Sequence, residues 1–344
     1  LPSYMGTSGN ASSALAAPKG NYGDIENTGF EISLNTHPIT GKFEWDSDFQ
    51  ISFNKNKLKG LAGTANAQIV GYGQWTDVVS VSSVGESLYN FYGFVCDGVY
   101  KDLEDLQTSP KPAKYPANGV FDRTNTVWVG DVKYKDINGD GMVDKLDMVP
   151  LTHSTYPLLM YGLGAEIRYK NLTLGVLFKG TGKTSFFYVG QKTTVNDETR
   201  LNGMGYMPFF EGNTGNVLPL AANPANRWIP RDYAIAHGID PSLAENKDAR
   251  FPRLQYGNNS NNSQLSTFWQ GDSRYIRLQE ITLNYHLAAA FLRRIGVSSL
   301  DIQFVGNNLH VWDKVKLFDP EQARWNGRVY PIPSTYSLQL YVNL

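Results

Sequence analysis

Hydrophobic and polar residues alternate along several stretches of this chain, with the two-residue spacing that is typical of β-strands with one apolar and one polar face. The clearest stretch is FEWDSDFQISF, which places its large apolar side chains on a single face: Phe43, Trp45, Phe49, Ile51 and Phe53. The residues between them are mostly acidic, amide or hydroxyl residues. The same pattern predicts seven strands, near residues 30–36, 43–53, 157–169, 172–180, 274–287, 298–307 and 336–344.

The connections between these strands alternate strictly in length. The short ones lie near residues 37–42, 170–171 and 288–297, and the long ones near 54–156, 181–272 and 309–335. Outer-membrane β-barrels have short turns on one side of the membrane and long loops on the other, whereas a soluble sandwich has no reason for this arrangement. We therefore expect strands that span a membrane with their apolar faces toward lipid, and we expect the segment YNFYGF to lie inside an outer loop.

Composition narrows the choice of class further. Aromatic residues make up 13% of the 344 residues and there are 33 glycines, which favours β structure. A formal net charge of −1 with scattered Lys and Arg argues against a nucleic-acid-binding face. Cys96 is the only cysteine, so the chain has no internal disulfide. The sequence also lacks an apolar run near the roughly 20 residues of a membrane helix, which leaves spanning strands open.

The segment KYKDINGDGMVDKLDMVP has the oxygen spacing of a calcium-binding loop. Counted from Asp136, the side-chain donors occupy positions 1, 3, 5, 9 and 12, and position 7 offers a backbone carbonyl: Asp136, Asn138, Asp140, Met142, Asp144 and Asp147. Strand-like residues precede this loop and Pro150 follows it, so a helix-loop-helix sensor is disfavoured. We predict a structural Ca²⁺ at 136–147. The alternative is a turn rich in Asp, Asn and Gly that needs no metal.

Aromatic residues in the long loops are candidates for contact with a ligand or with a covering protein, because aromatic faces suit both sugar rings and protein surfaces. They are Trp128, Tyr206, Phe209, Phe210, Trp228, Tyr233 and Trp269. The alternative for each of them is packing within the loops. We expect one or two to touch a ligand or a covering protein.

The chain resembles the C-terminal part of SusC-like (RagA-like) TonB-dependent transporters of the Gram-negative outer membrane. The resemblance runs over nearly the full length and is carried by segments in the order of the family: GDIENTGFEISLN, WDSDFQISFNKNKLKGL, GESLYNFYGFVCDGVYKD, GDVKYKDINGDGMVDKLDMVPL, YGLGAEIRYKNLTLGVLFKGTGK, SRYIRLQEITLNYHL, VGNNL, FDPE and GRVYPIPSTYSLQLYVNL. Each segment is weak alone, but their shared order makes a chance match improbable. The chain departs from the family at Leu344, where the family commonly ends on an aromatic residue.

The resemblance implies an all-β fold in which residues 1–344 are the C-terminal portion of a large antiparallel transmembrane β-barrel, with long extracellular loops and about 22 strands when complete. It implies import of oligosaccharides or peptides across the outer membrane with a SusD-like surface lipoprotein as a lid. Energy would arrive from TonB through an N-terminal part. We expect that part, the plug domain and the earlier strands to lie outside residues 1–344, and whether the cargo is a glycan or a peptide stays open.

Seven strands also leave two sheet edges, near Phe30 and Leu344, with unpaired backbone groups that hydrocarbon cannot satisfy. We expect the N-terminal barrel portion of the same transporter to close them. Two alternatives come from other classes. One is a soluble, calcium-pinned carbohydrate-binding β module. The other is a glycan-degrading enzyme, which is disfavoured because Asp46 and Asp48 are better explained as wall residues than as an acid-base pair. We therefore predict that the chain is not an enzyme.

Overall fold

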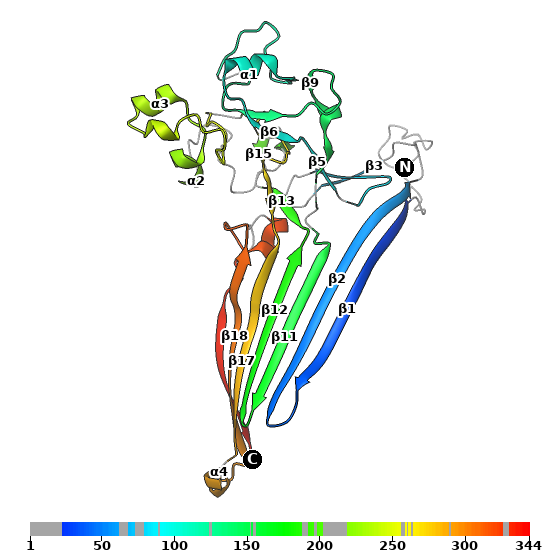
Figure 1. The fold of residues 1–344 in the computed structure, drawn as a ribbon, viewed down its shortest axis with the longest axis vertical. Helices are drawn as coiled ribbons and strands as arrows, with labels where there is room; N and C mark the ends of the chain where they lie inside the picture. The colour runs from blue at the N-terminus through cyan, green and yellow to red at the C-terminus, as the bar shows by residue number, and fades with distance from the viewer. Residues whose placement is uncertain are drawn as a thin grey trace, which may run out of the picture.

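A seven-stranded antiparallel sheet forms the main body of the chain in a computed structural model, with smaller elements gathered at one end (Figure 1). The structure describes residues 23–61, 68–72, 79–88, 90–123, 126–151, 153, 156–187, 192–195, 198–201, 219–255, 259, 261–262, 264–288, 290–325 and 330–344. The order of the strands in the large sheet is β1-β2-β11-β12-β17-β18-β19. Their bounds are Gly23–Ile39, Phe43–Leu61, Leu159–Tyr169, Leu172–Gly182, Tyr275–Leu287, Ser299–Asp313 and Thr335–Asn343.

All seven strands that the alternation predicts are present, and the all-β fold is confirmed. The difference lies at the loop end, where β1 and β2 stay paired from Phe30 and Phe53 up to Gly23 and Leu61. The alternating large apolar residues end at Phe30 and Phe53, whereas pairing between strands needs only backbone amides and carbonyls. The alternation therefore underestimates the lengths of β1 and β2. The connection predicted at 54–156 therefore begins after Leu61. The short turns lie within the predicted ranges, the first shortened to 40–42 because β1 continues to Ile39, and the turn at 288–297 carries helix α4 (Ala290–Arg294).

The register of the ladders places like residues in rows across the sheet. Ile51 of β2 lies opposite Ile32 of β1 and Tyr161 of β11, and Leu163 lies opposite Phe49 and Phe178. Successive residues point to opposite faces, so these rows build one apolar face. Polar side chains such as Gln50 occupy the other face. We call these the apolar face and the polar face of the sheet.

The apolar face is open to the surroundings. On β1, Phe30, Ile32 and Leu34 have exposed fractions of 51%, 53% and 54%. Each of the remaining strands of the sheet also has exposed large apolar side chains. A continuous apolar surface of this kind is rare on soluble monomers and marks contact with lipid or with another protein. From Phe43 to Phe53 the face runs for ten residue steps, which at a tilt of about 40° spans about 25 Å, the height of an outer-membrane apolar band.

Strands β1 and β19 lie at opposite edges of this sheet and do not pair with each other. This agrees with the expectation that the chain does not close into a small barrel. Within the described residues, no helix has the length and the apolar character required to cross a bilayer.

The described parts of residues 62–158 and 183–274 form what we call the loop assembly, which lies above the sheet in Figure 1. Its strands are short and make small sheets: β3 (Gln68–Tyr72), β4 (Val79–Ser83), β5 (Asn90–Gly93) and β10 (Val149–Pro150); β6 (Cys96–Val99) and β8 (Val132–Tyr134); β7 (Lys111–Pro112) and β9 (Met142–Val143); β13 (Ser185–Phe187) and β16 (Gln270–Asp272); β14 (Lys192–Val195) and β15 (Glu198–Leu201). The YNFYGF segment contributes β5 and lies outside the large sheet, as predicted.

Short helices complete the loop assembly: α1 (Leu103–Thr108), α2 (Pro219–Ala222), α3 (Arg231–Ala236), and the 3-10 turns η1 (Lys145–Asp147), η2 (Pro224–Asn226) and η3 (Pro241–Leu243). A fourth 3-10 turn, η4 (Pro320–Trp325), follows β18. Asp102 directly precedes α1 as its N-cap, and its side chain accepts a hydrogen bond from the Asp105 amide and so caps the first turn. Each element is too short to be stable alone, so the loop assembly depends on packing between its segments.

Among the described residues, most buried apolar side chains lie in the loop assembly. Phe91, Phe187 and Trp269 belong to one cluster of buried side chains, and Trp228 belongs to another beside Val99. Gly130 shows how closely these segments pack. Its φ of +86° favours glycine, and a Cβ at this position would collide with the indole ring of Trp228. The protein therefore buries apolar residues in its loops and exposes them on its sheet.

Candidate functional site

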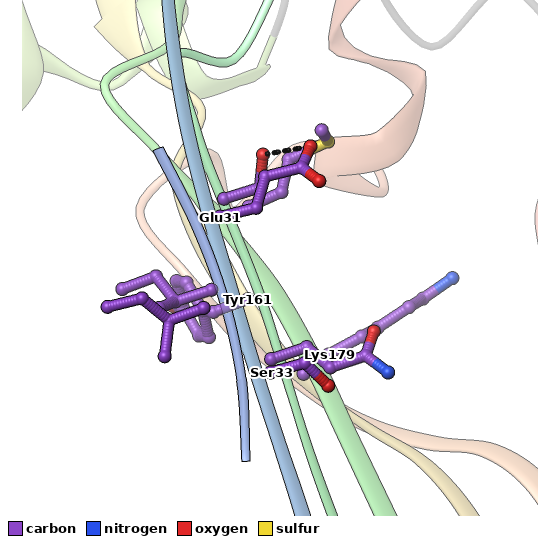
Figure 2. A pocket seen from close by; sticks show the side chains of 10 residues that line it. Glu31, Ser33, Tyr161 and Lys179 are labelled. Atoms are coloured by element: carbon purple, nitrogen blue, oxygen red, sulfur yellow. Dashed lines mark hydrogen bonds between the residues drawn. The ribbon is translucent and has the colours of Figure 1, made fainter. Parts of the chain in front are cut away.

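The polar face of the sheet is the first candidate surface. A hollow of about 620 Å³ runs over strands β1, β2, β11 and β12, and its lining includes Glu31, Ser33 and Lys179. Figure 2 shows these three side chains on one side of the strands and Tyr161 on the other. The Ser52 hydroxyl donates a 3.3 Å hydrogen bond to the Glu31 carboxylate. This surface offers donors and acceptors to a polar solute or to a second protein surface.

Near the short turns, the polar face carries an acidic network around one arginine. The Arg168 guanidinium lies 3.0 Å from Glu44, 2.9 Å from Asp46 and 2.5 Å from Glu166. Asp46 also binds the His37 ring at 2.6 Å. The alternation in the sequence brings these side chains to one face, because they occupy alternate positions of neighbouring strands. The arrangement is that of a solvated wall, as predicted for the carboxylates of this strand.

At the end of the polar face near the loop assembly, cationic side chains form ion pairs with carboxylates at the beginning of η4. Arg277 is almost fully buried and binds Asp319 at 2.6 Å and Glu321 at 2.8 Å. Glu321 also accepts from Lys179 at 3.0 Å. These contacts fasten the segment after β18 across the upper polar face. Because Asp319 and Glu321 lie about 40 residues or more from their partners in sequence, the spacing of the residues did not predict these contacts.

The calcium-type loop at 136–147 follows β8, contains β9 and ends with η1, and β10 follows it, so it is not flanked by α-helices. Its polar side chains are engaged with backbone amides of the loop. The Asp136 carboxylate accepts from the amides of Gly139 and Gly141 at 2.6 and 2.7 Å, and Asp140 accepts from Met142 at 2.8 Å. The amide oxygen of Asn138 accepts from the Asp140 amide at 2.9 Å. Asp144 caps η1 by accepting from the Leu146 amide.

Asp147 is the buried member of this loop. Its carboxylate accepts from the amides of Ile137 at 2.7 Å and Asp144 at 2.8 Å, which closes the two ends of the loop onto one side chain. Burial raises the pKa of Asp147, but these hydrogen bonds outweigh burial and leave the pKa below its ordinary value. Within the described residues, no group of three or more His, Cys, Asp or Glu side chains is arranged to hold a metal ion. The Ca²⁺ stays a prediction, and the turn is stabilised by its own hydrogen bonds.

The aromatic candidates divide according to burial. Trp228 and Trp269 are 4% and 1% exposed, and the Trp269 indole donates to the Asn262 carbonyl at 2.6 Å, so both rings pack inside the loop assembly and have little surface for a ligand. Trp128 is partly exposed and lies under the Arg123 guanidinium. Tyr233 is 39% exposed and stacks on His237. Tyr206, Phe209 and Phe210 lie outside the described residues.

A buried ion pair that the sequence did not reveal joins the two long loops. Asp131 is fully buried and lies 2.7 Å from the Arg253 guanidinium. Its carboxylate also accepts from the side-chain amides of Asn259 at 3.0 Å and Asn262 at 2.8 Å, and from the Trp128 amide at 2.8 Å. These partners lie more than 120 residues away, except Trp128. The pair holds the loop after β2 against the loop after β12.

Comparisons with known proteins give relatives along almost the whole chain. The chain is 28% identical over 340 residues to TonB-dependent receptor P26 of Formosa agariphila, covering 94% of this chain and 29% of that protein. It is 25% identical over 169 residues to TonB-dependent receptor SusC of Bacteroides thetaiotaomicron, covering 49% and 15%. The chain therefore spans less than a third of the length of these relatives. No family model matches the chain.

Solved structures show the same fold. A structure of the RagAB peptide transporter matches 94% of this chain and 29% of its own chain, with a TM-score of 0.63 and 16% identity. A structure of the RagAB peptide importer in the closed-closed state matches with a TM-score of 0.62 at 17% identity, covering 94% and 30%. These relatives are receptors and transporters, which fits the expectation that the chain is not an enzyme.

Proposed function

We propose that this chain, whose similarity to the C-terminal part of SusC-like TonB-dependent receptors extends through sequence and fold, forms part of the wall and the outer loops of an outer-membrane nutrient importer. The single observation that carries the proposal is the two-faced sheet, apolar and exposed on one face and polar on the other, with short turns at one end and a packed loop assembly at the other. Such a sheet separates lipid from a watery interior.

The complete transporter supplies the remaining parts in this proposal. The open edges of β1 and β19 pair with strands of an N-terminal barrel portion, which also carries the plug domain and the segment that contacts TonB. A SusD-like lipoprotein covers the loop assembly. The cargo is an oligosaccharide or a peptide, since both are polar solutes that the polar face can hydrogen-bond. Similarity to the RagAB peptide transporter favours a peptide.

Sidedness tests the membrane part of this proposal. In the complete transporter with Cys96→Ser, a cysteine at Val120 in the loop assembly should react with an impermeant thiol reagent on intact cells, because Val120 is 66% exposed. A cysteine at Asn171, in the short turn between β11 and β12, should react only after the outer membrane is permeabilised. Efficient labelling of Asn171→Cys on intact cells would contradict the orientation.

Uptake tests the transport part. Cells that lack the complete transporter should no longer accumulate the labelled oligosaccharide or peptide that it imports. The wild-type gene should restore this accumulation. Co-purification should recover a surface lipoprotein with the transporter. The competing function, a soluble carbohydrate-binding module, predicts instead that residues 1–344 are monodisperse without detergent and bind glycans alone.

Calcium at 136–147 is a further proposal. All donors are hard oxygens, and the carboxylates of Asp136 and Asp140 have room for more contacts than the hydrogen bonds that they accept. If Ca²⁺ binds, chelator should increase proteolysis of the 133–150 segment in the complete transporter, and Asp140→Ala should remove the difference made by chelator. Equal cleavage with and without chelator would show that the turn needs no metal.

A further inference from the structure

Two lysines, Lys55 and Lys183, lie at the end of the apolar face that is nearest to the loop assembly. Phe53 is the last large apolar residue on that face of β2, and its ring stacks with Phe30 across the β1-β2 pair. Lys55 occupies the next position on the same face, because alternate residues share a face. Lys183, directly after β12, places its ammonium 4.7 Å from the centre of the Phe53 ring. The edge of the apolar face therefore meets positive charge.

These lysines line a hollow of about 680 Å³ that we call the lysine hollow. It lies where β2 continues past the beginning of β11 at Leu159, so that one side of β2 has no neighbouring strand of the large sheet. Its lining is cationic, amide, hydroxyl and apolar, without a carboxylate: Phe53, Asn54, Lys55, Asn56, Ser87, Leu88, Asn90, His153, Tyr156, Pro157, Leu158, Met160 and Lys183. Among the described residues, neither Lys55 nor Lys183 has a carboxylate within 4.0 Å.

Several other cations at the same level of the sheet are paired. Lys59 lies 2.8 Å from Glu26 on the neighbouring strand. At the other side of the sheet, Arg274 and Lys314 share Asp272 at 2.8 and 3.7 Å. Among the described residues, Lys57 also has no carboxylate within 4.0 Å, although it faces Glu26 in register, so it adds positive charge on β2 beside the lysine hollow. An anionic group from outside the chain would balance it.

We propose that the lysine hollow binds the phosphate-bearing headgroup of an outer-leaflet lipid, whose acyl chains lie along the apolar face beside Phe53. This rests on the proposed function, which places the loop end of the sheet at the outer surface of the membrane. Lysines next to a bilayer surface attract anionic headgroups. Tyr156, which is 47% exposed, adds an amphipathic ring of the kind enriched at membrane interfaces. The adjacent apolar face selects an amphiphile over a free anion.

Lipid retention by the complete transporter tests this inference. The transporter is placed in phosphatidylcholine nanodiscs that contain a minor fraction of lipid A or of dephosphorylated lipid A, and retained lipid is counted by native mass spectrometry after release. Wild type should retain lipid A, and Lys55→Gln with Lys183→Gln should lower retention on the order of tenfold. The same variant should retain dephosphorylated lipid A as wild type does. Lys247→Gln, an exposed loop lysine, is the matched control and should change nothing.

Further variants and a competing anion show what causes a loss of lipid A retention. Lys55→Arg with Lys183→Arg keeps the charge and should retain lipid A, which excludes misfolding as the cause of a loss. Equal retention by wild type and the Gln variant would overturn the inference, as would full displacement of lipid A by millimolar inorganic phosphate, which would indicate a free anion site. Labelling at Val120→Cys and Asn171→Cys is done on the same variants. If labelling supports the membrane orientation while retention is unchanged, only the lipid inference fails.

Discussion

The sheet and the loop assembly place their large apolar side chains in opposite ways. On the sheet, Phe30, Ile32 and Leu338 are at least half exposed, whereas in the loop assembly Phe187 and Trp269 are almost fully buried. The loop assembly follows the rule of water-soluble proteins, in which apolar burial drives folding. The sheet reverses it because lipid surrounds the apolar face in the proposed setting. One chain thus carries two folding environments, and a substitution should act according to the region that contains it.

The largest effect should come from opening the buried pair in the loop assembly. Asp131→Ala leaves the Arg253 charge buried without its partner, which costs about 3–5 kcal/mol. Hydrogen exchange of the complete transporter should show loss of protection in the loop assembly while the strands of the sheet stay protected. Replacing both residues, as Asp131→Leu with Arg253→Met, should recover most of the protection. Uniform loss across the sheet would contradict the independence of the two regions.

The second effect concerns the sheet. Leu163→Arg places a charge near the middle of the apolar face and should cost about 2–4 kcal/mol of folding free energy in a bilayer. Gln50→Arg puts the same side chain on the polar face, one residue away in register, and should cost far less. Unfolding by urea in lipid vesicles measures both. Similar costs for the two variants would argue that the apolar face does not contact lipid.

A smaller effect separates steric clash from backbone strain inside the loop assembly. Gly130→Ala introduces a Cβ into the Trp228 ring at a positive φ, and we expect a loss of about 1–3 kcal/mol. Gly119→Ala is the matched control, because its φ is also positive but a Cβ would meet nothing within 4 Å. It should cost about 1 kcal/mol. Thermal unfolding of the loop assembly, followed by tryptophan fluorescence, ranks the two, and equal losses would mean that packing against Trp228 contributes little.

The smallest effect is a pH response of the turn at 136–147. Because the folded pKa of Asp147 is lowered, its hydrogen bonds add stability that is fully present above the unfolded value near 3.9 and is lost as the pH falls through the folded pKa. Proteolysis of the 133–150 segment by an acid protease should therefore rise below about pH 4. Asp147→Asn should flatten this rise, and an unchanged rise in that variant would assign the response to other groups.

The sequence predicted the sheet well and the loop assembly poorly, for physical reasons. Alternation along a strand such as 43–53 is a local signal, because the environment of each face is uniform over its length. The pairing of Asp131 with Arg253 is a tertiary contact across 122 residues that no local pattern encodes. Strands of two to four residues, such as β7 and β9, are likewise fixed by their neighbours.

The site residues divide in the same way. The loop at 136–147 forms the turn that its Asp, Asn and Gly spacing indicates, since Asx turns are local. The spacing could not tell that Trp228 and Trp269 are buried while Tyr233 keeps exposed surface, because the type of a residue does not set its depth. The pattern places the lysines directly after Phe53 at the beginning of a loop, although β2 continues through them to Leu61.

The alternation of short and long connections has a consequence for the order of folding. Each hairpin, β1-β2, β11-β12 and β17-β18, closes over a short turn and can form early from local contacts. Joining β2 to β11 requires closure of residues 62–158, and the entropy of closing such a loop exceeds that of a ten-residue loop by only about 2 kcal/mol. Assembly of the wall should thus be a docking of three hairpins that are already formed and of strand β19, with a rate set by the time that the loops need to bring them together.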